Sequence, residues 1–208
     1  SNLDAKLRNQ MRAEIIKLRE RIDTTFIYVT HDQTEAMTMG DRIVVMKDGF
    51  IQQVDTPQNL YDNPCNVFVA GFIGTPQMNF INCKLEKEGN NAYLHFGDVK
   101  IKLPEEKGNL PELQPYMGKE VIAGVRPEAI VDTPMQIAAL EDASFEVYVD
   151  VTELMGAEIY LYLVANKVVI DEAVAKKKNV VIDRSGEQKL TARVSARSTA
   201  RGGDTIKI

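Results

Sequence analysis

The sequence has few of the features that mark metal-binding, nucleic-acid-binding or membrane-spanning chains. Only two cysteines occur among the 208 residues, Cys65 and Cys83, and their spacing matches no metal-binding motif. A reduced pair is therefore expected rather than a disulfide. The net charge is −5, so the composition does not favour nucleic acid as a partner. No run of 18 apolar residues occurs, and a membrane-spanning helix is not expected.

Residues 24–49 are the most informative segment of the chain. Phe26–Val29 and Ile43–Met46 are short apolar runs that predict two buried strands. Thr34–Met39, between these runs, is expected to form a short helix. Asp48-Gly49 follows the second run and predicts a turn. The order of strand, helix and strand is typical of an α/β fold.

His31 is the best single candidate for chemistry in this segment. It lies directly after the first apolar run, and ligands of open α/β sheets bind at the carboxyl ends of strands. Asp32 or Gln33 is expected to begin the helix that follows. Histidine often acts as an acid, base or hydrogen-bond donor near neutral pH, but after a strand it is also commonly only a turn residue. The residues alone leave both interpretations open.

An ordered series of motifs resembles the switch-histidine region of an ABC transporter ATPase of the carbohydrate-importer type. The series covers Tyr28–Met37, Asp41–Ile43, Met46–Gly49, Gln53–Pro64 and Val67–Gly74, and the opening Ser1–Arg8 resembles the D-loop and its helix. In that family the switch histidine hydrogen-bonds the γ-phosphate and helps to position the attacking water, as phosphoryl transfer requires. The resemblance implies this role for His31 in a full-length parent protein.

Asp4 has two interpretations. It resembles the D-loop aspartate, which in the family lies at the interface between two ATPase subunits. It is also a physically sound N-cap for a helix that continues through Ala5, Lys6 and Leu7. The two roles are compatible with each other.

The nucleotide-binding motifs of that family are missing from the sequence. There is no G-x-x-x-x-G-K-[ST] phosphate loop, no LSGGQ-type signature and no apolar strand ending in Asp-Glu. Without the phosphate loop, the chain offers no nest of backbone N–H groups and no lysine for the phosphates. We therefore expect a C-terminal fragment that is inactive alone and binds no cofactor or metal. The parent would use ATP and Mg²⁺.

The sequence pattern changes near residue 75. The expected fold class is α/β plus β, with the truncated end of a P-loop ATPase domain over residues 1–75. Over residues 76–208, many short strand-like runs alternate with turns, which suggests a small β-barrel. The resemblance implies that this barrel is a regulatory domain of OB-fold type. The predicted strands are Asn79–Leu85, Ala92–Phe96, Val99–Leu103, Val121–Val125, Phe145–Leu154, Glu158–Val164, Val168–Ile170, Asn179–Asp183, Leu190–Val194 and Thr205–Ile208.

Two short motifs extend the resemblance into this second part. Residues 124–128 match the G-x-R-P-E element of the family's OB-fold domain, and residues 153–158 resemble its E-x-x-G-x-E turn. The motif residues are Arg126, Glu128, Glu153, Gly156 and Glu158. A structural role is sufficient to explain them, because arginine pairs with carboxylates and glycine readily adopts a positive φ. Subunit contact or effector binding is the alternative.

The resemblance implies an ATP-binding subunit that powers carbohydrate uptake. Such a subunit would pair with a second copy or another ATPase subunit, and it would lie on the cytoplasmic face of the membrane against permease subunits. This chain would keep the dimerisation and regulatory region. The alternative is a self-standing OB-fold module that binds an oligosaccharide or a small oxyanion.

Truncation has a physical consequence for residues 1–75. Without the central strands of an ATPase domain, Phe26–Val29 and Ile43–Met46 would be left as uncovered apolar strands. We expect this region either to pair with another chain or to depart from the family arrangement, while the barrel stays intact.

Overall fold

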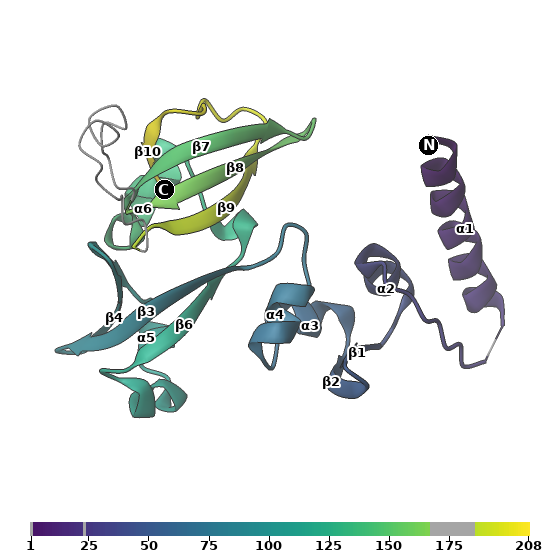
Figure 1. Cartoon of the computed structure of the whole chain (residues 1–208). Coiled ribbons are helices and arrows are strands. Elements are labelled where there is room, and N and C mark those ends of the chain that lie inside the picture. The colour runs from purple at the N-terminus through teal and green to yellow at the C-terminus, as the bar shows by residue number, and fades with distance from the viewer. Residues whose placement is uncertain (1, 23, 167–185) are drawn as a thin grey trace, which may run out of the picture. The chain divides into compact units, whose positions relative to one another are not determined.

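The computed structural model describes residues 2–22, 24–166 and 186–208, with only part of the side chains in the first helix. The chain forms two compact units, Ser1–Gln77 and Met78–Ile208 (Figure 1). Among the described residues, no helix has both the length and the apolar character needed to cross a membrane.

The first unit is built from helices and one β-hairpin. Each short helix begins at a polar N-cap: Asp32, Thr56 and Asn66 accept hydrogen bonds from backbone N–H groups of the first turn. The elements are α1 (Asn2–Arg21), α2 (Gln33–Met39), β1 (Ile43–Lys47), β2 (Phe50–Asp55), α3 (Pro57–Asp62) and α4 (Val67–Phe72).

The hairpin of β1 and β2 forms where the turn was predicted. Asp48 and Gly49 have φ values of 50° and 81°, as a tight two-residue hairpin turn requires. The prediction that Ile43–Met46 is fully buried is wrong, because in β1 only Val45 is buried. Successive side chains of a strand point to opposite faces of the sheet, and only the face of Val45 is covered. Val44 and Met46 lie on the other face and are half exposed.

The predicted strand at Phe26–Val29 is also wrong. These residues form no strand, and Ile27 and Val29 are each 91% exposed. An apolar run becomes a strand only when another strand satisfies its backbone N–H and C=O groups. No described segment supplies that partner, so the run forms no strand and stays exposed.

The described residues of the second unit form two four-stranded antiparallel sheets, in the orders β5-β4-β3-β6 and β10-β7-β8-β9. This all-antiparallel arrangement confirms the expected OB-fold type after the α/β part. The strands predicted at 168–170 and 179–183 lie outside the described residues. The described strands are β3 (Asn79–Glu88), β4 (Asn91–Phe96), β5 (Val99–Lys102), β6 (Glu120–Val125), β7 (Glu146–Leu154), β8 (Glu158–Ala165), β9 (Gln188–Ser195) and β10 (Thr205–Lys207).

A single core joins these two sheets. Buried side chains alternate with outward-facing ones along the strands, as in β3, where Ile81, Cys83 and Leu85 point inward. The cluster continues through Val149 on β7 and Leu161 on β8, both fully buried. Short helices that the sequence did not suggest connect the strands, namely α5 (Glu105–Gly108), η1 (Pro111–Tyr116), η2 (Pro127–Ala129), α6 (Pro134–Ala139) and η3 (Glu141–Ala143).

Buried Asn79 connects the two sheets by hydrogen bonds. Its Nδ2 donates to the carbonyl oxygens of Val125 (3.2 Å) and Thr191 (2.8 Å), and its Oδ1 accepts from the Thr191 N–H at 2.7 Å. Because β3 and β9 belong to different sheets, this amide fixes how the two sheets pack.

Candidate functional site

His31 lies on a loop that its neighbours brace. The Thr30 hydroxyl donates to Glu35 Oε2 (2.7 Å) and accepts from the Asp32 N–H (3.0 Å). Asp32 Oδ1 accepts from the N–H groups of Thr34 (2.8 Å) and Glu35 (3.2 Å). The hydrogen bond from Glu35 N–H is the largest cause of the lowered pKa of Asp32. The exposed His31 side chain is thus presented by a loop with a fixed backbone.

Glu35, in the first turn of α2, is a support of this loop that the sequence did not reveal as such. Its carboxylate also accepts a hydrogen bond from the Tyr28 hydroxyl at 3.2 Å, so it ties Tyr28 and Thr30, which both precede His31, to α2. A signal for it exists in the sequence. Glu35 lies three positions after the N-cap Asp32, where helices often carry an acidic residue.

The loop also contacts the end of the first unit. Gln33, the first residue of α2, accepts a hydrogen bond through its Oε1 from the backbone N–H of Gly74 at 3.0 Å. Asp4, the other candidate of the first unit, lies in α1. Its side chain is outside the part of α1 that the structure describes, so both of its interpretations stay predictions.

Arg193 of β9 bridges the two motifs of the second unit. Its guanidinium lies 3.9 Å from Glu128 of the G-x-R-P-E element and 3.8 Å from Glu158 of the E-x-x-G-x-E turn. Pro127, beside Glu128, is fully buried, and its 3₁₀ helix packs against β9. Arg126 precedes this helix and is half-buried. Sequence spacing gave no signal for Arg193, because β9 joins β8 only through long-range pairing.

The other two motif residues lie at the β7–β8 hairpin. Glu153 Oε2 accepts a hydrogen bond from the Tyr162 hydroxyl at 2.9 Å, and this bond is the main cause of the raised pKa of Tyr162. Gly156, in the turn, has φ +86°, a conformation that glycine adopts without strain. Of the motif residues, the structure brings Glu128 and Glu158 to one arginine, while Glu153 has its own partner.

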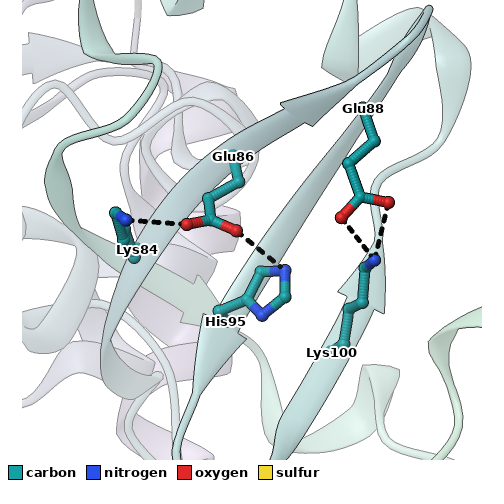
Figure 2. Close-up of polar contacts among 5 residues, drawn as sticks. All are labelled: Lys84, Glu86, Glu88, His95 and Lys100. Atoms are coloured by element: carbon teal, nitrogen blue, oxygen red, sulfur yellow. Dashed lines mark hydrogen bonds and ion pairs between the residues drawn. The ribbon is translucent and has the colours of Figure 1, made fainter.

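A second charged cluster lies on β3, β4 and β5 (Figure 2). Glu86 Oε1 pairs with Lys84 Nζ at 2.7 Å, and Lys100 Nζ contacts both oxygens of Glu88 at 2.6 and 2.7 Å. His95 Nε2 lies 3.3 Å from Glu86 Oε2 and is buried, but it lacks the alignment of a hydrogen bond.

This cluster includes three groups of the kind that bind metals. Ligand atoms of Glu86, Glu88 and His95 lie within 4.8 Å of one another. A lysine already neutralises each carboxylate, however. The hydrogen bond from Lys84 is the main cause of the lowered pKa of Glu86, and the one to Glu88 is the main cause of the raised pKa of Lys100. The arrangement is therefore a ladder of exposed ion pairs across three strands.

Comparison with known proteins identifies relatives for the whole chain. Residues 74–130 match the MalK OB fold domain. The chain is 44% identical over 208 residues to the oligosaccharides import ATP-binding protein MsmX of Bacillus subtilis, covering 100% of this chain and 50% of that protein.

Two further relatives agree with this match. The trehalose import ATP-binding protein SugC of Mycobacterium tuberculosis is 44% identical over 215 aligned positions, covering 100% of this chain and 53% of SugC. An uncharacterized ABC transporter ATP-binding protein of Escherichia coli, YcjV, is 50% identical over 162 residues, which are 78% of this chain and 42% of YcjV. The chain thus spans about half the length of the curated relatives it matches. Over that span, the chain is similar to ATP-binding proteins for oligosaccharide and trehalose import, and part of it matches the MalK OB fold domain.

Proposed function

We propose that this chain is part of an ATP-binding subunit of an ABC importer, in which ATP hydrolysis drives the uptake of a sugar or a related solute. The observation that carries this proposal is the similarity over the full chain to ATP-binding proteins for oligosaccharide and trehalose import. The MalK OB-fold match over residues 74–130 supports the same assignment.

In this proposal, His31 is the switch histidine. Phosphoryl transfer depends on fixed donors placed around the transferring group, and His31 is an exposed donor on a braced loop. ATP and Mg²⁺ would be held by motifs that this sequence lacks, so His31 is the residue of this chain assigned to the γ-phosphate. Asp4 would lie at the contact with a paired ATPase subunit.

Exposed apolar side chains in the first unit support its assignment to an incomplete ATPase domain. Ile27 and Val29 are 91% exposed, and Phe50 and Ile51 are 73% and 62% exposed. Large uncovered apolar areas mark surfaces that pack against other protein. We assign residues 1–75 to the end of the ATPase domain, whose remaining part would cover these side chains.

Residues 76–208 are assigned to the regulatory and dimerisation domain. This unit has its own core, and Glu128 and Glu158 of its two motifs both pair with Arg193 of β9. The partners are a second ATPase subunit and the permease subunits at the cytoplasmic face of the membrane. The solute would be recognised by those other subunits.

The test is to join the chain to the upstream ATPase half of MsmX and to measure ATP hydrolysis. The joined protein should hydrolyse ATP, and the 208-residue chain alone should not. His31→Ala should reduce the rate about a hundredfold, as loss of a transition-state donor does. His95→Gln changes the other histidine of the chain and serves as the matched control.

Two outcomes would contradict the proposal. Unchanged hydrolysis in His31→Ala would remove this histidine from the mechanism. A joined protein that folds but never hydrolyses ATP would favour the alternative, a self-standing OB-fold module for an oligosaccharide or oxyanion.

A further inference from the structure

Gln33 links the His31 loop to the segment that leads into the second unit. The hydrogen bond from Gly74 N–H to Gln33 Oε1 (3.0 Å) spans 41 positions of sequence. Gly74 lies just before Gln77, where the first unit ends, and it is the first residue of the MalK OB-fold match. The bond therefore lies within the first unit and ties the first residue of α2 to the segment that leads into the second unit.

Both ends of this bond are anchored in the fold. Gln33 begins α2, whose N-cap Asp32 follows His31 directly. Gly74 follows Ile73, which ends α4, is only 3% exposed and donates its N–H to the Val69 carbonyl oxygen at 2.9 Å. The bond therefore connects the first turn of α2 with the residue that follows the C-cap of α4.

We propose that Gln33 is a positioning residue that couples the His31 loop to residues 74–77 and, through them, to the regulatory domain. This inference rests on the proposed function, in which His31 contacts the γ-phosphate. Gln33 itself needs no contact with nucleotide, because its side-chain oxygen is engaged by Gly74. The orientation of the regulatory domain would then bias the position of His31, and nucleotide at His31 would bias that orientation by the same free energy.

A simpler role must be separated from coupling, namely that the bond only holds α2 in place. Gln33→Ala removes the acceptor, and Gln33→Glu keeps an oxygen that accepts from Gly74 N–H. Gln58→Ala is the matched control. Gln58 also lies in the first turn of a short helix, but its hydrogen bond goes to Asp62 of the same helix.

The first test uses the 208-residue chain and NMR. A flexible Gly-Ser segment is inserted between Gln77 and Met78 to uncouple the second unit, and the imidazole signals are compared. The chain has only two histidines, so the His31 signal is assigned directly and His95 reports on the second unit. We expect the insertion to shift the His31 signal in the parent chain, Gln33→Glu and Gln58→Ala, and to leave it unshifted in Gln33→Ala.

Two results would overturn the coupling role. The insertion could shift the imidazole signal of His31 equally with and without the Gln33 side chain. Alternatively, it could leave this signal unshifted in the parent chain. Either result means that residues 74–77 do not act on the His31 loop through Gln33, whatever the activity of the complete protein.

The second test measures ATP hydrolysis in the protein joined to the upstream half of MsmX. The insertion should change the rate about fivefold when Gln33 is present, the lower end of ordinary allosteric couplings, and should not change it in Gln33→Ala. If the joined protein hydrolyses no ATP at all, the proposed function fails, and the NMR comparison still decides whether Gln33 couples the two segments.

Discussion

The two compact units differ in how far they bury their apolar side chains. Among the described residues of the second unit, a cluster of sixteen buried residues runs through both sheets. Among those of the first unit, the corresponding cluster has four members, Val45, Leu60, Val69 and Ile73. The first unit leaves long apolar side chains in water instead, with Ile27 and Val29 almost fully exposed.

The pairing of strands explains this difference in burial better than the amino-acid composition of the two units does. The apolar run at Val121–Val125 becomes part of β6 because β3 lies beside it in register. The equally apolar run at Phe26–Val29 has no such neighbour among the described residues and forms no strand. The strands of the second unit find partners within the chain, whereas the run at Phe26–Val29 finds none among the described residues and stays exposed.

The largest expected effect is the loss of a core leucine in the second unit. Leu161 is fully buried on β8, so Leu161→Ala should lower the free energy of unfolding by about 2–5 kcal/mol. Leu154→Ala is the matched control, because this leucine of the same hairpin is 70% exposed and its loss should cost less than about 0.5 kcal/mol.

The first unit supplies the opposite case. Ile27→Ala should leave stability within about 0.5 kcal/mol of the parent chain, because this side chain is 91% exposed. Urea unfolding followed by tyrosine fluorescence, together with amide exchange in β8, gives these values. A large loss in Ile27→Ala would show that the first unit is closed in solution and would remove the contrast between the units.

Loss of the amide between the sheets should have the next largest effect. Asn79→Ala would leave the Thr191 N–H and two carbonyl oxygens without their hydrogen bonds, which should cost about 1–3 kcal/mol. Asn82→Ala, on the exposed face of the same strand, should cost much less. If the two variants lose equal stability in urea unfolding, the closed core of the second unit does not depend on the Asn79 bridge.

Helix starts and tight turns were predictable from the sequence, whereas the pairing of strands was not. The start of α2 and the turn at Asp48-Gly49 depend on side chains a few positions apart. The turn forms where the sequence indicated, and of the two candidates for the start of the helix, Asp32 and Gln33, the structure selects Asp32 as the N-cap. The error at Phe26–Val29 has a non-local cause, because strand formation requires a partner that hydropathy does not reveal. Arg193 was missed for the same reason: it is far from Glu128 and Glu158 in the sequence and meets them only because β9 pairs with β8 and packs against η2.

A smaller effect is expected at the N-cap of α2, and it should depend on pH. Asp32→Ala should lower the stability of this helix by about 1 kcal/mol, whereas Asp32→Asn should nearly preserve it. The pKa of Asp32 lies below its ordinary value of 3.8, mainly through the hydrogen bond from Glu35 N–H. The ionised carboxylate therefore stabilises the fold above that value, and the contribution is lost as pH falls through the lowered pKa.

The measurement is the amide chemical shift of Thr34 and Glu35 during an acid titration. Both signals should move as Asp32 takes up its proton in the parent chain, and the asparagine variant should show no such step. A step of equal size in Asp32→Asn would assign the titration to another carboxylate.

The smallest loss of stability is expected on substitution of Arg193. The size of this loss distinguishes a structural from a regulatory role for the two motifs of the second unit. The pairs of Arg193 with Glu128 and Glu158 lie at 3.9 and 3.8 Å, and all three side chains are partly exposed. Exposed ion pairs of this kind contribute about 0–1 kcal/mol, and salt screens them. Arg193→Met should therefore lower stability by less than about 1 kcal/mol, and the loss should shrink at high salt.

Lys189→Met is the control for this variant, because Lys189 is exposed on the same strand, β9. A loss in Arg193→Met that is larger than about 2 kcal/mol, or that persists at high salt, would mean that the arginine packs as part of the core instead. A small loss of stability joined to a changed ATPase rate in the completed protein has a different meaning. It would show that the G-x-R-P-E and E-x-x-G-x-E elements act on a partner or an effector, because the ion pairs of Arg193 would then contribute little to the stability of the fold.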